Sequence, residues 1–283
     1  MPYALMLLLL LSWPLAANQV VRHALPETAD DLRTQYPLAL LRLALDHSGS
    51  DYRLEGTAAM TQSRAMALME HNRGVDVVWT MTSREREAAL RPIRIPIDKG
   101  LLGWRVLLVR GSDAGRFVAA DHKTLKQMIA GQGHDWPDRE ILLNNRYVTR
   151  ALSYDALFNM LARGHIDYVP RSVTEVQDEA NIHANKGLVI EPSLMLWYPA
   201  ALYYFVHPDN EHLARQIERG LEAALADGSF DQLFNQTHEP ILKALAVTQR
   251  RVIMLTNPLL PEATPLQRGA LWHPLPAQGT GGP

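Results

Sequence analysis

Residues 74–86, GVDVVWTMTSRER, hold the pattern that decides the fold. Gly74 ends a helical segment over 62–73, residues 75–79 form a compact apolar strand, and a turn rich in Thr and Ser leads to the charged residues 84–86. Upstream, a strand at 20–24, a helix with leucines at helical spacing and a strand at 52–54 are predicted. Strands that alternate with helices indicate βαβ units and a mostly parallel sheet.

The alternation of strands and helices continues along the rest of the chain. The run 101–110, LLGWRVLLVR, is long and apolar and is expected to cross the centre of the molecule. Further elements are expected as helices at 121–130, from about Pro137, at 154–162 and at 211–226, and as strands before 131–133, at 165–169 and at 200–206. Residues 257–283 are rich in proline and glycine, which indicates an extended wrap on the surface or partial disorder.

Composition excludes several classes of protein. The chain has 283 residues, 28 Lys plus Arg, 30 Asp plus Glu, and no cysteine. The absence of cysteine removes disulfides, thiolate zinc sites and cysteine nucleophiles. The formal charge of −2 argues against a dedicated nucleic-acid binder. We therefore expect an α/β protein with a substantial core.

The N-terminus indicates export. The apolar run at 1–11 is shorter than the roughly 20 residues of a membrane-spanning helix, but its length suits a signal peptide. Ala16 and Ala17 are small residues of the kind found at a cleavage point, so we expect residues 1–17 to be removed near Ala17 and the protein to act in the periplasm. No basic residue precedes the run, which leaves a buried first strand or helix as the alternative.

Three ordered segments resemble the type 2 periplasmic solute-binding proteins, in particular the bacterial extracellular solute-binding family 3 of polar amino-acid receptors. The first segment is 74–86, similar to the family's G-x-x-D, strand, Ser/Thr-rich turn and E-R. The second is 154–168, YDALFNMLARGHIDY, similar to its helix, G-R-I-D and strand. The third is the strand 203–208 with D-G-S-F at 227–230, which resembles the closing part of the family.

The resemblance implies two α/β lobes that are joined by two hinge strands and close on a ligand. Each lobe would be a mostly parallel sheet flanked by helices. We expect the first lobe at 18–103 and 203–250, the second lobe at 104–202, and a proline-rich tail at 251–283. The candidate hinges are 101–107 and 198–202.

In the first lobe, the resemblance places the ligand's carboxylate at the turn after the strand. Thr82 and Ser83 stand at the family's Ser/Thr positions, and Arg86 stands at its carboxylate-binding arginine, with Arg84 as a competitor. A guanidinium suits this role because its planar fork donates two parallel hydrogen bonds to a carboxylate. The alternative is that Arg84 and Arg86 belong to a solvated charge run with Glu85 and Glu87.

In the second lobe, the sequence departs from the family pattern. Amino-acid receptors carry an aspartate after the G-R-I-D strand, where it pairs with the ligand's ammonium, but this chain has Arg171 and Ser172 there. An ammonium beside Arg171 would meet a like charge, so a second anionic group or another polar solute is expected there. The alternative is that Arg171 pairs with a carboxylate of the chain at position 167, 175 or 178.

Aromatic and acidic residues complete the candidate site. The turn 131–138 stands where the family presents a helix N-terminus to its ligand, so Asp135 and Trp136 are candidates, although Asp135 or Asp138 would serve equally as a helix cap and Trp136 as packing. In the first lobe, Tyr36 and Trp79 are the aromatic candidates.

These residues predict a periplasmic protein that captures a small polar or anionic solute, either amino-acid-like or a carboxylate. It would be a monomer without cofactor, metal or nucleic acid, and its partner would be the permease of an ABC importer or a membrane sensor. The alternatives are a dehydratase-like enzyme on the same fold, with His134, Asp135 and Glu140 as its acids and bases, and an orphan sensor or partner-binding protein. Motifs of nucleophilic, zinc-protease and phosphate-binding sites are absent from the sequence.

Overall fold

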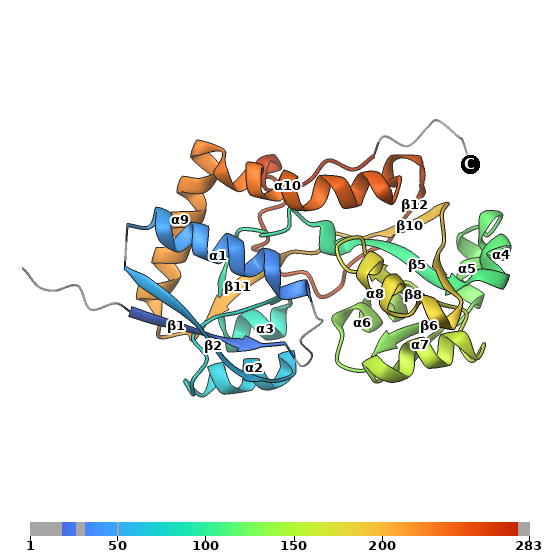
Figure 1. Ribbon diagram of the computed structural model, residues 1–283, viewed down its shortest axis with the longest axis horizontal. Helices are drawn as coiled ribbons and strands as arrows, with labels where there is room; N and C mark the ends of the chain where they lie inside the picture. Colours follow the sequence, from blue (N-terminus) through green and yellow to red (C-terminus); the bar gives the residue numbers. More distant parts are fainter. Residues whose placement is uncertain (1–18, 27–31, 50, 277–283) are drawn as a thin grey trace, which may run out of the picture.

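Two α/β lobes stand side by side in the computed structural model, which describes residues 19–26, 32–49 and 51–276 (Figure 1). The predicted signal peptide at 1–17 lies outside the described residues. In the described part of the chain, no helix is both long and apolar enough to cross a membrane.

The first lobe is built on two small sheets. Its strands are β1 (Gln19–Leu25), β2 (Tyr52–Ala59), β3 (Val78–Met81), β4 (Arg91–Ile93) and β11 (Leu202–Val206). The pair β1–β2 is parallel, whereas β11 runs antiparallel to both β3 and β4. The backbone carbonyl of Arg22 in β1 accepts the N–H groups of Asp76 (2.8 Å) and Val77 (3.1 Å), just before β3. These bonds hold the two sheets edge to edge.

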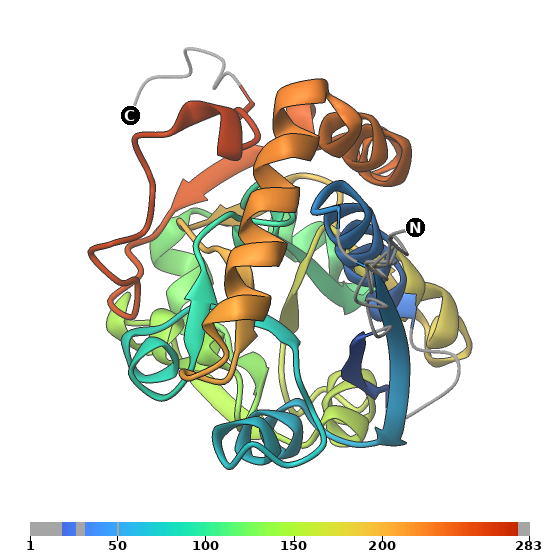
Figure 2. The same cartoon turned by 90° about the vertical axis from the view of Figure 1, so that its left-hand side faces the viewer.

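Helices cover both sides of this lobe. They are α1 (Gln35–His47), α2 (Gln62–Glu70), α3 (Arg84–Ala89), α9 (Glu211–Asp227) and α10 (Ser229–Ala244). The face of α1 that carries Leu40, Leu41, Ala44 and Leu45 is buried, as the leucine spacing predicts. Figure 2 shows α9 crossing the front of the lobe, and α10 follows it after a turn at Gly228.

The second lobe is a seven-stranded mixed sheet. Its strands are β5 (Trp104–Arg110), β6 (Ala130–Gly133), β7 (Thr149–Leu152), β8 (Tyr168–Ser172), β9 (Leu188–Ile190), β10 (Leu194–Trp197) and β12 (Arg251–Met254), and the helices around it are α4 (Ala114–Val118), α5 (His122–Gln127), α6 (Pro137–Asn144), α7 (Tyr154–Ala162) and α8 (Val176–Ile182). The strand order is β12-β10-β5-β8-β6-β7, with β9 also paired to β5. Strand β5 lies in the middle and runs antiparallel to β8, β9 and β10, while β6 is parallel to β7 and β8.

The C-terminal segment connects the two lobes a further time. Residues 251–254 form β12, parallel to β10, although the sequence predicted a tail from 251. The chain then returns past the hinge, where the Asn257 side chain donates to the carbonyl of Pro199 (2.9 Å). It goes on to the first lobe, where Arg268 forms an ion pair with Glu222 of α9 and the His273 N–H donates to the Lys99 carbonyl (2.8 Å).

The contact between α1 and α9 requires a glycine. A Cβ at Gly220 would lie 1.7 Å from the carbonyl oxygen of Ala44. We predict that Gly220→Ala destabilises the protein by about 2 kcal/mol or more, because the helices must separate, and this outweighs a gain of up to about 1 kcal/mol in helix propensity. Urea denaturation measures the change.

The matched control is Gly115→Ala in α4, where a Cβ has no neighbour within 4 Å. This variant is expected to be as stable as the wild type or slightly more stable. Equal stability of the Gly220→Ala and wild-type proteins would show that α1 and α9 do not approach as closely as described.

Candidate functional site

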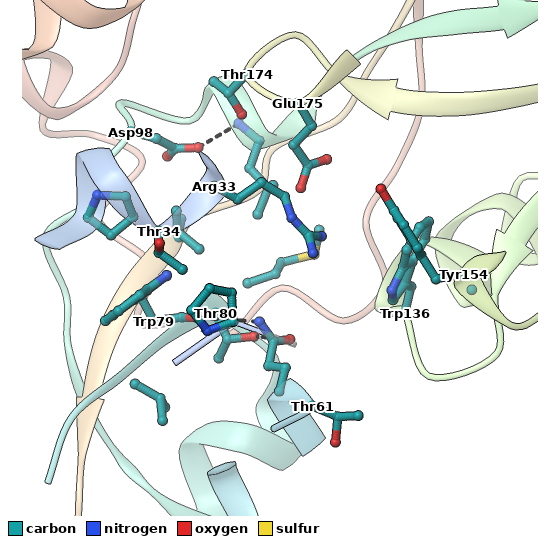
Figure 3. Close-up of a pocket in the computed structure, with 18 of the residues that line it drawn as sticks. Arg33, Thr34, Thr61, Trp79, Thr80, Asp98, Trp136, Tyr154, Thr174 and Glu175 are labelled. Atoms are coloured by element: carbon teal, nitrogen blue, oxygen red, sulfur yellow. Dashed lines mark hydrogen bonds between the residues drawn. The ribbon is translucent and has the colours of Figure 1, made fainter. Parts of the chain in front are cut away.

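A cleft of about 730 Å³ lies between the lobes and is lined by both (Figure 3). The first lobe contributes the start of α1, the start of α2, strand β3 and part of α10, and the second lobe contributes the turns before α6, α7 and α8. This volume falls within the range of roughly 300–1,000 Å³ that is typical of small-molecule sites. The cleft is therefore large enough for a small polar solute.

Arg86 is held at the first-lobe side of the cleft by its own helix and strand. The Ser83 side chain caps α3 by accepting the Arg86 backbone N–H (3.2 Å). The Arg86 Nη1 donates to Thr80 Oγ1 (2.6 Å) and to the Met81 carbonyl (2.8 Å). Within the described residues, Arg86 forms no ion pair. Burial lowers the pKa of Arg86 below its usual value, and the charges of carboxylates in the second lobe oppose this effect. The guanidinium thus lines the cleft without a carboxylate partner among the described residues.

Arg171, by contrast, is neutralised inside the protein. Its Nε and Nη2 donate to the Glu179 carboxylate (2.6 and 2.7 Å), and Glu175 lies 3.0 Å from Nη2. The Trp136 ring stacks on the guanidinium at 4.2 Å. Burial by itself lowers the pKa of Arg171, but the charges of Glu175 and Glu179 outweigh it and raise the pKa. Of the two roles that the sequence left open, the structure shows the pairing with carboxylates.

A second buried arginine extends this network toward the hinge. Arg105 Nη2 lies 2.6 Å from Asp138 Oδ1, and its Nη1 lies 3.7 Å from Glu175. The Tyr198 hydroxyl donates to the same Asp138 oxygen. Burial raises the pKa of Glu175, but the charges of Arg171 and Arg105 outweigh it and hold the pKa below its usual value. Carboxylates and guanidiniums therefore alternate along the second-lobe wall.

Asp98 is a buried carboxylate at the hinge end of the cleft. It precedes β5, and its side chain accepts the N–H groups of Gly100 (3.0 Å) and Leu102 (2.6 Å). In the described part of the chain no cation forms an ion pair with it. Burial raises the pKa of Asp98 to about 7, although the two backbone N–H groups oppose the shift. The site thus holds an acid that is half ionised near neutral pH.

His238 of α10 lines the same cleft. Its ring packs edge-on against Tyr36 at 4.4 Å, and both ring nitrogens are buried without a hydrogen-bond partner among the described residues. Burial lowers the pKa of His238 to about 4, so the imidazole is neutral at pH 7. The Tyr36 hydroxyl donates to the Ile97 carbonyl (2.6 Å), next to Asp98.

The structure brings six of the ten sequence-predicted residues to the cleft and places four elsewhere. The six that line it are Tyr36, Trp79, Arg86, Asp135, Trp136 and Arg171. The side chains of the other four form hydrogen bonds with other groups of the protein. Thr82 donates to Glu87 (2.6 Å), Ser83 caps α3, and Arg84 donates to the Leu260 carbonyl (3.0 Å) of the C-terminal segment. Ser172 is buried in β8 and donates to the Leu101 carbonyl (3.2 Å).

Sequence reasoning missed Asp98, Arg105, Glu175 and His238 as cleft residues. For Arg105 a signal was present, because a charged side chain inside an otherwise apolar strand must find a buried partner. The sequence around Asp98 and His238 does not distinguish them from capping and packing residues. Asp98 reaches the cleft because of the path of the hinge segment, and His238 because of the position of α10.

Groups from the two lobes meet at the mouth of the cleft. The Ser63 hydroxyl at the start of α2 donates to Asp135 Oδ2 (2.9 Å) in the turn before α6. The guanidinium of Arg33 lies over the Tyr154 ring at 5.5 Å. These contacts show a closed arrangement in which polar groups of both lobes face a shared space.

The groups considered for acid–base chemistry do not form a pair. His134 is exposed and its Nδ1 lies 3.4 Å from the Leu152 carbonyl, Asp135 accepts from Ser63, and Glu140 is not among the lining residues. Among the described residues, no three His, Asp or Glu side chains are grouped as a metal site requires.

Comparison with known proteins identifies the fold. Neither a protein-family model nor a curated protein sequence matches the chain. Solved structures do match: an ancestral arginine-binding protein bound to arginine (TM-score 0.59, 14% identity, 78% of this chain and 98% of that one), and an arginine-specific periplasmic binding protein of Salmonella typhimurium (0.58, 15%, 78% and 99%). A histidine kinase sensor domain similar to periplasmic binding proteins also matches (0.58, 15%, 78% and 96%).

The chain therefore has the two-lobed type 2 fold of periplasmic binding proteins, as the three sequence segments predicted. In this architecture, polar groups of both lobes line the cleft between them.

The raised pKa of Asp98 predicts a pH-dependent stability. The folded protein keeps a proton on this carboxyl up to a pKa of about 7, while the unfolded chain releases it near pH 4. Stability from this group is thus lost as pH rises from about 4 to about 7. Asp98→Asn cannot ionise, so its stability relative to wild type should increase by about 2 kcal/mol between pH 5 and pH 8. Urea denaturation at the two pH values measures this change.

Asp121→Asn is the control, because Asp121 also caps a short helix, by accepting the Thr124 N–H (2.7 Å), but is exposed. Its relative stability should not change between pH 5 and pH 8. A flat profile for Asp98→Asn as well would mean that the Asp98 carboxyl titrates normally.

Proposed function

We propose that this protein is a solute-binding protein that holds a small amino-acid-like solute between its lobes. Arg86 supports this proposal most directly, because a half-buried guanidinium that lines the cleft without an ion pair is suited to a carboxylate. In this role its remaining N–H groups donate to the solute while Thr80 and the Met81 carbonyl keep the fork in place.

The charges around the cleft favour a solute with a cationic group as well as a carboxylate. The charged lining residues are the arginines Arg33, Arg86, Arg105 and Arg171 and the carboxylates Asp98, Asp135, Asp138, Asp155, Glu175 and Asp178. The excess of carboxylates attracts an ammonium. Since Arg171 is neutralised by Glu175 and Glu179, it gives no support to the second anionic group that the sequence suggested.

We further propose that the protein is exported to the periplasm as a monomer, with residues 1–17 as its signal peptide. It would deliver its solute to the permease of an ABC importer or report it to a membrane sensor. Support comes from the apolar N-terminal run and from structural neighbours that are periplasmic binding proteins or sensor domains.

Binding should depend on Arg86 and not on its neighbour Arg84. A thermal-shift screen against amino acids, dicarboxylates and other small anions identifies a stabilising solute. We predict that Arg86→Ala weakens the affinity for that solute by about 10- to 100-fold, because a charge-assisted hydrogen-bond pair is lost. Isothermal titration calorimetry measures the affinities.

Arg84→Ala is the matched control on the same helix, because Arg84 points to the carbonyls of the C-terminal segment. It should bind the solute as wild type does. The proposal is wrong if no small solute stabilises the wild-type protein, or if Arg86→Ala binds the solute unchanged.

A further inference from the structure

We propose that the C-terminal segment, residues 251–273, restricts the opening of the cleft by binding both lobes and the hinge between them. The inference goes beyond the proposed function, because it concerns the movement of the lobes and does not depend on the solute. A two-lobed fold with two hinge strands opens when a few backbone torsions in those strands change. In this chain the backbone crosses between the lobes twice more, and both additional crossings must adjust as well.

The first additional crossing leads from α10 in the first lobe to β12 in the second lobe. Strand β12 pairs with β10, and Ile253 and Leu255 are buried in the core of the second lobe. Arg250, just before the strand, is also buried. Its side chain donates to the carbonyl of Leu245, which follows α10 (2.8 Å), and to the carbonyl of Leu194, which begins β10 (3.1 Å). One guanidinium thus holds both ends of this crossing.

The second additional crossing is short. Asn145, which follows α6 in the second lobe, accepts the Thr256 N–H (3.1 Å) and donates its side-chain amide to the Thr256 carbonyl (2.7 Å). Three residues later, the Leu259 carbonyl accepts the backbone N–H of Arg84 at the start of α3 (3.2 Å). Three extended residues span at most about 11 Å. The start of α3 and the end of α6 therefore stay close to each other while these bonds hold.

The same two helices are connected to opposite walls of the cleft. Helix α3 carries Arg86, and Trp136 directly precedes α6. When the lobes rotate apart the helices separate, so the crossing must lose its anchor at Asn145 or at Arg84. The Arg84 side chain adds a bond to the Leu260 carbonyl (3.0 Å), but the backbone bond does not need that side chain. Arg84→Ala is therefore expected to keep this anchor.

The C-terminal segment also binds both hinges. At the second hinge, the Asn257 side chain donates to the Pro199 carbonyl (2.9 Å). Directly before the first hinge, the Trp272 ring packs on Gly100 so closely that a Cβ there would lie 2.6 Å from it. Leu271, the preceding residue, is buried in a core cluster that includes much of the first lobe. Rotation at either hinge changes the backbone next to these contacts, so the segment resists it.

The contacts at the mouth of the cleft do not limit opening in the same way. The exposed hydrogen bond and the cation–π contact described above contribute about 1 kcal/mol each. The crossing 256–259 is held by two hydrogen bonds of the Asn145 side chain on one lobe and by the backbone and side chain of Arg84 on the other. It therefore resists separation at least as strongly, and its covalent length limits the distance as well.

The test measures the distance between the lobes in the whole chain, without any solute. The chain has no cysteine, so Ala67→Cys on α2 and Asn159→Cys on α7, both exposed, place one spin label on each lobe. In Figure 1, α2 and α7 lie toward the bottom of the view, whereas α10 and β12 lie toward the top. Double electron–electron resonance gives the distribution of distances between the labels. We expect a single narrow distribution for this double-cysteine protein.

A longer second crossing should allow the lobes to separate. A Gly-Ser-Gly-Ser-Gly insertion between Asn257 and Pro258 removes no side chain and adds up to about 16 Å of reach. The mean distance between the labels should increase by about 5 Å or more, and its distribution should broaden. The matched control is the same insertion between Glu262 and Ala263, which are exposed and follow the anchor at Arg84. The control should keep the narrow distribution.

Asn145→Ala is the second variant, because it removes the anchor at Thr256 without altering the C-terminal segment. It should broaden the distribution toward longer distances, whereas Asn181→Ala, at an exposed position of α8, should leave the distribution unchanged. The near-ultraviolet circular dichroism spectrum shows whether each variant is folded. If the 257/258 insertion prevents folding, Asn145→Ala decides in its place.

Two results would overturn the inference. One is a folded 257/258 insertion variant that keeps the narrow distribution. The other is a protein without the insertion that already shows a second, longer distance. Neither result bears on the solute, so the proposed function stands or fails separately, by the affinity of Arg86→Ala.

Discussion

A buried chain of opposite charges fixes the second-lobe side of the cleft. It runs from Asp138 to Arg105 and from Glu175 to Arg171 and Glu179, and it ties β5, β8, α6 and α8 together. Charges buried to this extent are stable only when each is paired, because breaking one pair leaves an uncompensated charge that costs about 3–5 kcal/mol. The network therefore sets where the Trp136 ring stacks and how the turn before α6 faces the first lobe.

Two charged side chains that line the cleft do not belong to this network of pairs. Arg86 on the first lobe and Asp98 at the hinge form no ion pair within the described residues, and both line the cleft. Burial disfavours the charged form of both groups, since it lowers the pKa of Arg86 and raises the pKa of Asp98. The two side chains belong to groups of opposite charge and line the same cleft.

The sequence predicted the α/β class and most element positions, because these follow from local pattern. Six of the ten residues that the family resemblance indicated line the cleft. Strands and helices follow from apolar spacing. Arg86 was predicted from the resemblance of residues 74–86 to the solute-binding family, because the charge pattern alone favours a solvated run. Strand β8 begins at Tyr168, three residues later than the predicted strand, so Ser172 lies inside the sheet and not in a turn toward the cleft. Arg84 lies two residues before Arg86 on the same helix, but its side chain donates to the C-terminal segment, which no local pattern predicts.

The sequence by itself determined the α/β class and the apolar run 101–110 that contains β5, since each depends on residues close together in the chain. Its resemblance to a known family implied the two lobes and the arginine after the first-lobe turn. The tertiary structure alone decided which charges are paired. Arg171 meets Glu179 across the turn after β8, Asp138 meets Arg105 across 33 positions, and His238 enters the cleft from α10. The physical reason is that the energy of a charge depends on its burial and on its neighbours in space, and neither is a property of the local sequence.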